Sequence, residues 1–73
     1  MTIWKDCSLR YRDRVRAKIR RLLSEEGSRT AHVLAMRISL DCTLVSAALE
    51  EMKSMDIVFC RRTDGGVIVW SVK

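Results

Sequence analysis

The sequence predicts an α+β fold in which three helices are followed by a two-stranded β-hairpin. Apolar residues recur at three- and four-residue spacing in three successive segments, as expected of amphipathic helices. Two short runs of β-branched and aromatic residues then flank a turn rich in glycine, which is typical of a hairpin. The chain has 73 residues and no proline. We therefore expect one domain, with an N-terminal arm over residues 1–8, helices over 9–56 and the hairpin over 57–73.

The first helix is expected over residues 9–26. Its spacing gathers five apolar residues on one face, and we expect these to be buried: Tyr11, Val15, Ile19, Leu22 and Leu23. Asp6 or Ser8 is placed to cap its N-terminus, and Gly27 to end it in a left-handed conformation. The residues before it, 2–4, are expected to pack as an arm or as an edge strand.

Two shorter helices are expected next. The second opens near Thr30, with Ser28 or Thr30 as its cap, and turns inward Ala31, Leu34, Ala35 and Ile38. After a polar break at residues 39–41, Asp41 is a good cap for a third helix. This helix runs from Cys42 to about Met55 and turns inward Val45, Ala48, Leu49 and Met52. Asp56 follows, and aspartate tolerates a left-handed conformation better than most residues.

The hairpin is predicted from its composition. Residues 57–62 and 67–72 are the two runs, and Thr63-Asp64-Gly65-Gly66 between them is a strong turn signal. Because this glycine pair lies between strands, it does not have the strand–loop–helix context of a phosphate-binding loop.

Composition limits the classes of function. The three cysteines, Cys7, Cys42 and Cys60, form no CxxC pair, and His32 is the only histidine. A zinc site needs about four nitrogen or sulfur ligands, so we expect no metal and no cofactor. No positioned base besides His32 is available for nucleophilic catalysis, so we do not expect an enzyme. The N-terminus lacks the apolar stretch of a signal peptide, which favours the cytoplasm, or the nucleus of a eukaryotic host.

The net charge of +5 is unevenly distributed. Residues 1–27 carry eight basic and four acidic side chains, residues 28–56 three and four, and residues 57–73 three and one. On the first helix, Arg10, Arg14 and Arg21 fall together opposite the apolar face, with Lys18 beside them. This stripe is either a phosphate-binding surface or an ordinary solvated face, and the sequence favours neither.

From Thr30 to Val58 the chain resembles a winged helix-turn-helix domain without a gap. The residues that carry the resemblance are Thr30-Ala31, Leu34-Ala35, Ile38, Ser39-Leu40, Asp41, Val45-Ser46, Ala48-Leu49, Met52 and Ile57-Val58. With the first helix and the hairpin, which is the wing of such a domain, the resemblance covers residues 9–72. Most of the matched positions are core positions, so they indicate the fold far more than the function.

Two groups within that class are similar. Thr30-Ala31-His32, Leu34-Ala35 and Trp70 resemble the Z-form nucleic-acid-binding winged helices. That family's signature asparagine, tyrosine and prolines correspond here to Ser46, Glu50 and Ile68-Val69, so only Trp70 carries over. Residues 45–55 resemble the third helix of small bacterial regulators such as the ferrous-iron transport protein FeoC. Its wing carries a cysteine cluster, whereas this chain has only Cys60 there, so an iron–sulfur role is not supported.

The resemblance implies nucleic acid, most readily duplex DNA, as the partner. The candidate contacts lie at the start of the second helix, on the third helix and in the wing: Arg29, Thr43, Ser46, Lys53, Arg61, Arg62 and Trp70. Such a protein would be a non-enzymatic regulator of transcription or replication. The alternative is a winged-helix adaptor that binds a protein, through its first or third helix, and no DNA. The slightly acidic middle of the chain and Glu50 favour the adaptor, and the arginines of the first helix and wing favour nucleic acid.

Overall fold

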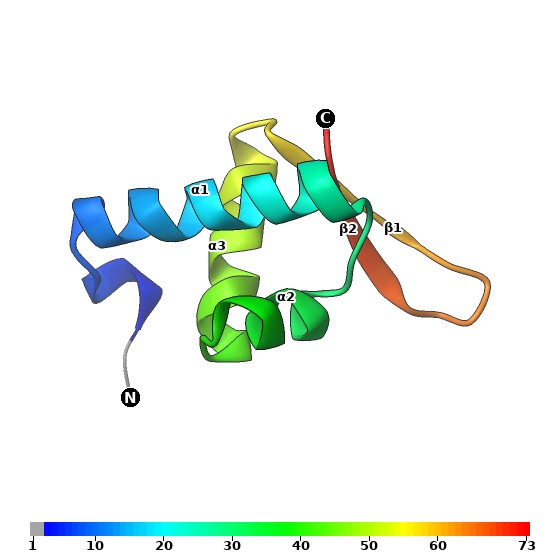
Figure 1. Cartoon of the computed structure of the whole chain (residues 1–73), viewed down its shortest axis with the longest axis horizontal. Coiled ribbons are helices and arrows are strands. Elements are labelled where there is room, and N and C mark those ends of the chain that lie inside the picture. Colours follow the sequence, from blue (N-terminus) through cyan, green and yellow to red (C-terminus); the bar gives the residue numbers. More distant parts are fainter. Residues whose placement is uncertain (1–2) are drawn as a thin grey trace.

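The computed structural model describes residues 3–73 (Figure 1). A short 3-10 helix, η1 (Trp4–Asp6), precedes three α-helices: α1 (Leu9–Glu26), α2 (Ala31–Ile38) and α3 (Cys42–Ser54). Two antiparallel strands, β1 (Val58–Arg62) and β2 (Ile68–Val72), complete the chain. The predicted α+β fold with a C-terminal hairpin is therefore confirmed.

Side-chain caps set the start of each α-helix. Ser8 accepts a hydrogen bond from the backbone N–H of Tyr11 at 3.2 Å, and Thr30 accepts one from Val33 at 3.2 Å. The Asp41 carboxylate accepts one from the N–H of Thr43 at 2.8 Å. These contacts satisfy donors that have no partner inside the helix, which confirms Ser8, Thr30 and Asp41 as the caps.

Each α-helix is followed by a residue with a positive φ angle. Gly27, after α1, has φ 82° and ψ −163°, so it ends the helix outside the left-handed helical region predicted for it. Ser39 is left-handed at φ 57°, and Asp56 has φ 64°. Between α2 and α3 the chain changes direction by 116°, within the range of about 90–120° typical of helix-turn-helix units.

No single helix within residues 3–73 is long and apolar enough to cross a membrane. Only α2 and α3 taken together reach that length and composition, and they are bent by 116° relative to each other.

The core lies where the helices meet the base of the hairpin. Val15, Ile19 and Leu23 of α1 pack against residues of α2 and α3 that are at most 5% exposed: Leu34, Ala35, Val45, Ala48, Leu49 and Met52. All nine were predicted as inward. Four further predicted residues, Tyr11, Leu22, Ala31 and Ile38, are half-buried at the edge of this core.

Four core residues were not predicted from the sequence. They are Trp4, Leu44, Val58 and Trp70, of which the two tryptophans are each 6% exposed. Leu44 closes the core at the first turn of α3, and the other three reach it from η1 and the hairpin.

Of the two alternatives expected for residues 2–4, an arm or an edge strand, the edge strand is wrong for the residues that the structure describes. Trp4 opens a 3-10 turn, closed by hydrogen bonds from Asp6 N–H to the Ile3 carbonyl at 2.9 Å and from Cys7 N–H to the Trp4 carbonyl at 3.1 Å. This turn lets the indole of Trp4 enter the core, which an exposed edge position would not. Thr2, also part of that expectation, lies outside the described residues.

The hairpin has a fixed register. Val58 pairs with Val72, Cys60 with Trp70 and Arg62 with Ile68. On its other side, β2 pairs with residue 29: Arg29 N–H donates to the Trp70 carbonyl at 3.0 Å, and Trp70 N–H donates to the Arg29 carbonyl at 2.8 Å. β2 is thus held on both sides, and the base of the hairpin is tied to the segment between α1 and α2.

Candidate nucleic-acid interface

α3 presents one polar face to solvent. Thr43, Glu50 and Lys53 are exposed, and Ser46 is half-buried. On a helix with 3.6 residues per turn these four positions lie within a single broad face. The opposite face is the buried one, so the core fixes which side chains of α3 are available to a partner. Glu50 lies near the middle of the exposed face, and its carboxylate is the only acidic group there.

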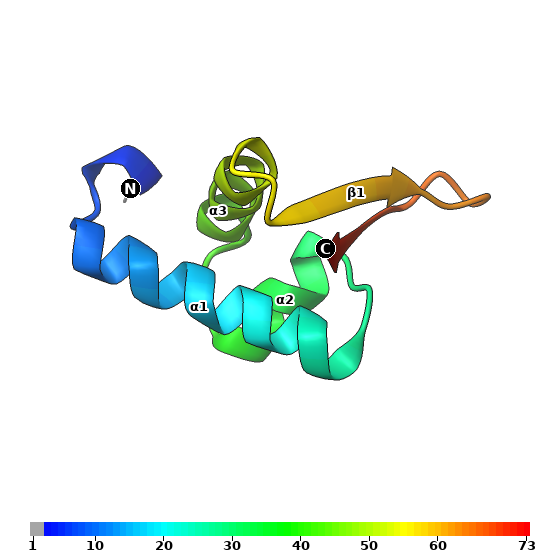
Figure 2. The same cartoon turned by 90° about the horizontal axis from the view of Figure 1, so that it is seen from above.

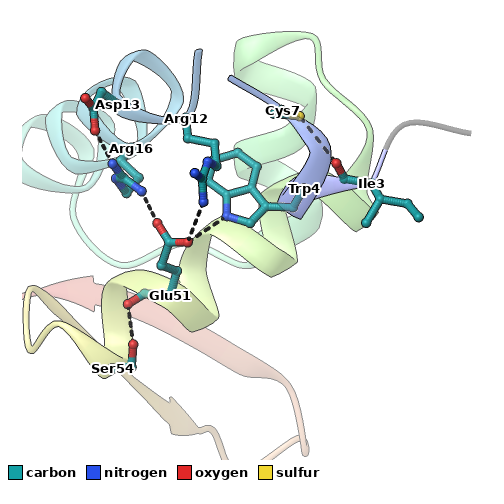
Figure 3. Close-up of polar contacts among 8 residues, drawn as sticks. All are labelled: Ile3, Trp4, Cys7, Arg12, Asp13, Arg16, Glu51 and Ser54. Atoms are coloured by element: carbon teal, nitrogen blue, oxygen red, sulfur yellow. Dashed lines mark hydrogen bonds and ion pairs between the residues drawn. The ribbon is translucent and has the colours of Figure 1, made fainter. Parts of the chain in front are cut away.

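An ion-pair cluster holds α3 against α1 and η1 (Figure 3). Glu51 follows Glu50 by one residue and therefore points toward α1 instead of solvent. Its carboxylate accepts a hydrogen bond from the indole Nε1 of Trp4 at 3.0 Å, pairs with Arg16, and lies 3.7 Å from the guanidinium of Arg12. Asp13 pairs with Arg16 from its other side. We name Trp4, Arg12, Arg16 and Glu51 the Glu51 cluster.

The Glu51 cluster changes the interpretation of the basic residues of α1. Arg12 and Arg16 serve the internal packing of the protein, with side chains 26% and 14% exposed. Sequence reasoning missed this role because Arg16 and Glu51 are 35 positions apart. The remaining basic residues of α1, including Arg10, Arg14 and Lys18, are exposed.

The wing carries two exposed arginines, Arg61 and Arg62, at the end of β1. Within residues 3–73 neither has a carboxylate within 4.0 Å. Because successive side chains of a strand point to opposite faces, the two arginines differ in direction. Arg62 lies opposite Ile68, on the face that Trp70 shares, and Arg61 lies opposite Val69 on the other face.

Arg29 and Trp70 form the base of the wing. The guanidinium of Arg29 donates to the Ser28 carbonyl at 2.7 Å and lies 3.8 Å from the Glu26 carboxylate. Glu26 also pairs with Arg37 of α2 at 2.7 Å. Trp70 is 6% exposed, so little of it is accessible to a partner. Of the seven predicted site residues, Arg29 and Trp70 therefore make the most contacts within the protein itself.

The described residues form no group of three or more His, Cys, Asp or Glu side chains able to hold a metal ion. Cys7, Cys42 and Cys60 are free thiols, of which Cys42 is exposed. No pocket opens between residues 3 and 73. The candidate site is consequently a surface, formed by the exposed face of α3 and by the wing beside it.

A helix-turn-helix followed by a two-stranded wing defines a winged-helix fold, and comparison with known proteins supports this assignment. The chain superimposes on the Zalpha domain of Carassius auratus PKZ, solved in complex with Z-DNA, with a TM-score of 0.79 and 24% identity over 86% of this chain and 98% of that one. The apo Zalpha domain of zebrafish PKZ gives a TM-score of 0.81 and 19% identity over 85% and 95%.

A mutant of Lactococcus lactis ZitR is also similar, with a TM-score of 0.69 and 20% identity over 93% of this chain. The chain spans only 45% of that ZitR chain. No protein-family model and no curated protein sequence matches this sequence. At these identities the likeness establishes the winged-helix fold, which the resemblance of residues 9–72 predicted.

Proposed function

We propose that this winged-helix protein binds duplex nucleic acid, most readily DNA, with α3 and the wing as its contact surface. In this proposal Thr43, Ser46 and Lys53 lie against the backbone, and Arg61 and Arg62 extend the contact from the wing. Arg29 and Trp70 would contribute at the base of the wing, on the side of β2 that pairs with the segment between α1 and α2. The protein would act as a regulator of transcription or replication and carry out no catalysis.

The observation that carries the proposal is that the two wing arginines are exposed and form no ion pair within the described residues. Arg61 and Arg62 are exposed on a paired strand, and within residues 3–73 neither has a carboxylate within 4.0 Å, so their charge is available to a partner. Arginine binds phosphate through a planar, bidentate hydrogen-bonding edge. The Zalpha domain of Carassius auratus PKZ, which has the same fold, was solved with Z-DNA, and this gives further support.

α3 itself offers little for reading a base sequence. α3 has no arginine, asparagine or glutamine, and Lys53 is its one side chain of a type that commonly reads a base, by donating to guanine. Thr43 and Ser46 donate equally well to phosphates. We therefore propose binding that is mostly electrostatic and tolerant of sequence.

The test is a titration of random-sequence duplex DNA at two salt concentrations. Each phosphate that the protein neutralises contributes about 0.9 to the slope of log affinity against log salt. With about three to six phosphates contacted, the affinity should fall by orders of magnitude between low and high salt. A protein that binds no duplex at low salt would refute the proposal.

A second candidate function is that of a protein-binding adaptor. The observation in its favour is Glu50, a carboxylate near the centre of the exposed face of α3, where a phosphate backbone would be repelled. Elution from heparin at low salt would favour the adaptor, since an adaptor needs no cationic surface.

A further inference from the structure

The outer face of α1 carries a row of cations that the fold does not use. Arg10, Arg14 and Lys18 follow one another at intervals of four residues, so they stand on one side of the helix, and all three are exposed. We name these three residues the basic stripe. Within residues 3–73 none of them has a carboxylate within 4.0 Å, whereas Arg21, further along the helix, pairs with Glu25 at 3.0 Å.

The basic stripe does not stabilise the helix that carries it. Like charges four residues apart on a helix repel each other, which applies to Arg10 with Arg14 and to Arg14 with Lys18. The order of charges along α1 is also opposite to the order that the helix dipole favours, which is acidic residues in the first turn and basic residues in the last. The first turn of α1 holds Arg10 and no acid, and the last turn ends in Glu25 and Glu26 with no basic residue. Helix stability therefore cannot explain the stripe, and an anionic partner would relieve both repulsions.

The basic stripe faces away from the candidate interface. Val15, Ile19 and Leu23, on the opposite side of α1, are buried between α1 and the rest of the protein. Figure 2 shows α1 along one side of the molecule, with α3 and β1 on the other. The molecule measures 21 Å along its shortest axis. A duplex seated on α3 and the wing is thus separated from the basic stripe by the body of the protein.

We propose that the basic stripe binds the phosphate backbone of a second duplex, so that one molecule joins two nucleic-acid segments. The inference rests on the proposed function for the first duplex. From Arg10 to Lys18 the helix advances by eight residue steps, which at 1.5 Å each is about 12 Å. Duplex DNA presents about seven phosphate charges over that length of its axis. An unpaired row of cations is complementary to such a regular anionic surface.

The experiment measures bridging and single-duplex binding separately. One duplex is immobilised on beads and a second, fluorescent duplex is added, so that the fluorescence retained by the protein reports bridging. Fluorescence anisotropy with one short duplex reports simple binding. The stripe variant is Arg10→Gln with Arg14→Gln. Its matched control, Lys5→Gln with Arg20→Gln, removes the same charge from exposed positions outside the stripe.

We expect the stripe variant to bind a single duplex within about twofold of the unmodified protein and to lose at least tenfold in bridging. The control variant should keep both its single-duplex affinity and its bridging. Arg61→Ala with Arg62→Ala should lower both, because bridging needs the first contact. Circular dichroism of each variant checks that it is folded.

Three results would overturn the inference while leaving the proposed function intact. In the first, the unmodified protein binds one duplex but retains no second one. In the second, the stripe variant bridges as well as the control variant. In the third, the stripe variant loses single-duplex affinity in proportion to bridging, which would place the stripe in the first contact. Binding to phosphatidylserine vesicles that depends on the stripe, without bridging, would assign it to a membrane surface instead. Absence of any duplex binding refutes both proposals together.

Discussion

The indole Nε1 of Trp4 donates a hydrogen bond to the Glu51 carboxylate at 3.0 Å, across 47 positions of the chain. The same carboxylate pairs with Arg16. One residue of α3 thereby fixes both η1 and α1, on the side of α3 next to its exposed face. The orientation of the candidate interface depends on this carboxylate.

Removing that carboxylate should therefore destabilise the fold. We expect Glu51→Ala to lower the free energy of unfolding by about 2 kcal/mol, because Arg16 and Trp4 Nε1 lose their shared acceptor in a partly buried site. Glu51→Gln, which still offers an oxygen to Trp4, should cost about half as much. Urea unfolding followed by circular dichroism measures both changes. Glu50→Ala, at the neighbouring exposed position, is the control and should stay within about 0.5 kcal/mol. Equal effects at positions 50 and 51 would contradict the importance of the cluster.

The turn between α2 and α3 gives a second prediction for stability. Ser39 is exposed and holds φ 57°, a conformation that is costly for any residue with a Cβ atom and worst for β-branched ones. Ser39→Val should lower the free energy of unfolding by about 1 kcal/mol or more, and Ser39→Gly should leave it unchanged or raise it by a few tenths. Thermal unfolding of the pair measures the difference. A Val variant as stable as the Gly variant would show that the turn readily adopts another conformation.

The charge order of α1 predicts that a substitution in the basic stripe can stabilise the protein. Arg10→Glu places a carboxylate in the first turn, where the helix dipole favours it, and replaces a repulsion with Arg14 by an attraction. The new carboxylate also repels Asp13, three residues further on, so the net rise in the free energy of unfolding should be a few tenths of a kcal/mol at low salt. The gain should shrink in about 1 M salt, where the Debye length falls to about 3 Å. A stability that falls, or a gain that salt leaves unchanged, would disprove the electrostatic explanation.

For the wing, the expected readout is the salt dependence of duplex binding. Arg61→Ala and Arg62→Ala together should reduce the log–log slope by about one to two. Since the two side chains point to opposite faces of the hairpin, the single variants should differ, and the one that faces the duplex should account for most of the change. Should the double variant bind as the unmodified protein does at every salt concentration, the wing is not in contact with the duplex.

Replacing Glu50 should distinguish the two candidate functions, because it should raise the affinity for a duplex but lower the affinity for a protein partner. A unit charge about 6–8 Å from a phosphate is worth roughly 2 kcal/mol at an effective dielectric constant of about 20, before salt screening. Glu50→Gln should tighten duplex binding several-fold and Glu50→Lys more, with little change in stability. In an adaptor the same substitutions would weaken the protein complex and leave DNA binding negligible. An unchanged duplex affinity for Glu50→Lys at low salt would show that α3 does not face nucleic acid.

Features with a local cause could be predicted from the sequence, and features with a distant cause could not. The span of α1, the caps Ser8, Thr30 and Asp41, and the hairpin all follow from neighbours within about four residues. The burial of the Trp4 side chain depends instead on α3, whose Glu51 carboxylate accepts the indole N–H, and the pairing of Arg29 with Trp70 depends on the fold as a whole. For the same reason the helical spacing could place Arg10, Arg14 and Lys18 on the outer face of α1, but it could not show that Arg12 and Arg16 pair with Glu51 of α3.

Because β2 pairs on both of its sides, the base of the wing is tied to the rest of the protein while its turn is not. At the base, Trp70 is held by Arg29 on one side and by Cys60 on the other, and its side chain is anchored in the core. Beyond Arg62 only the turn's own bonds remain: Thr63 N–H donates to the Val67 carbonyl at 2.8 Å, and Gly66 N–H to the Thr63 carbonyl at 2.9 Å. Arg61 and Arg62 thus lie where the part of the wing that is tied to the rest of the protein ends. In the proposed complex, the core and residue 29 would set the direction of the two arginines relative to α3, whatever conformation the turn beyond them adopts.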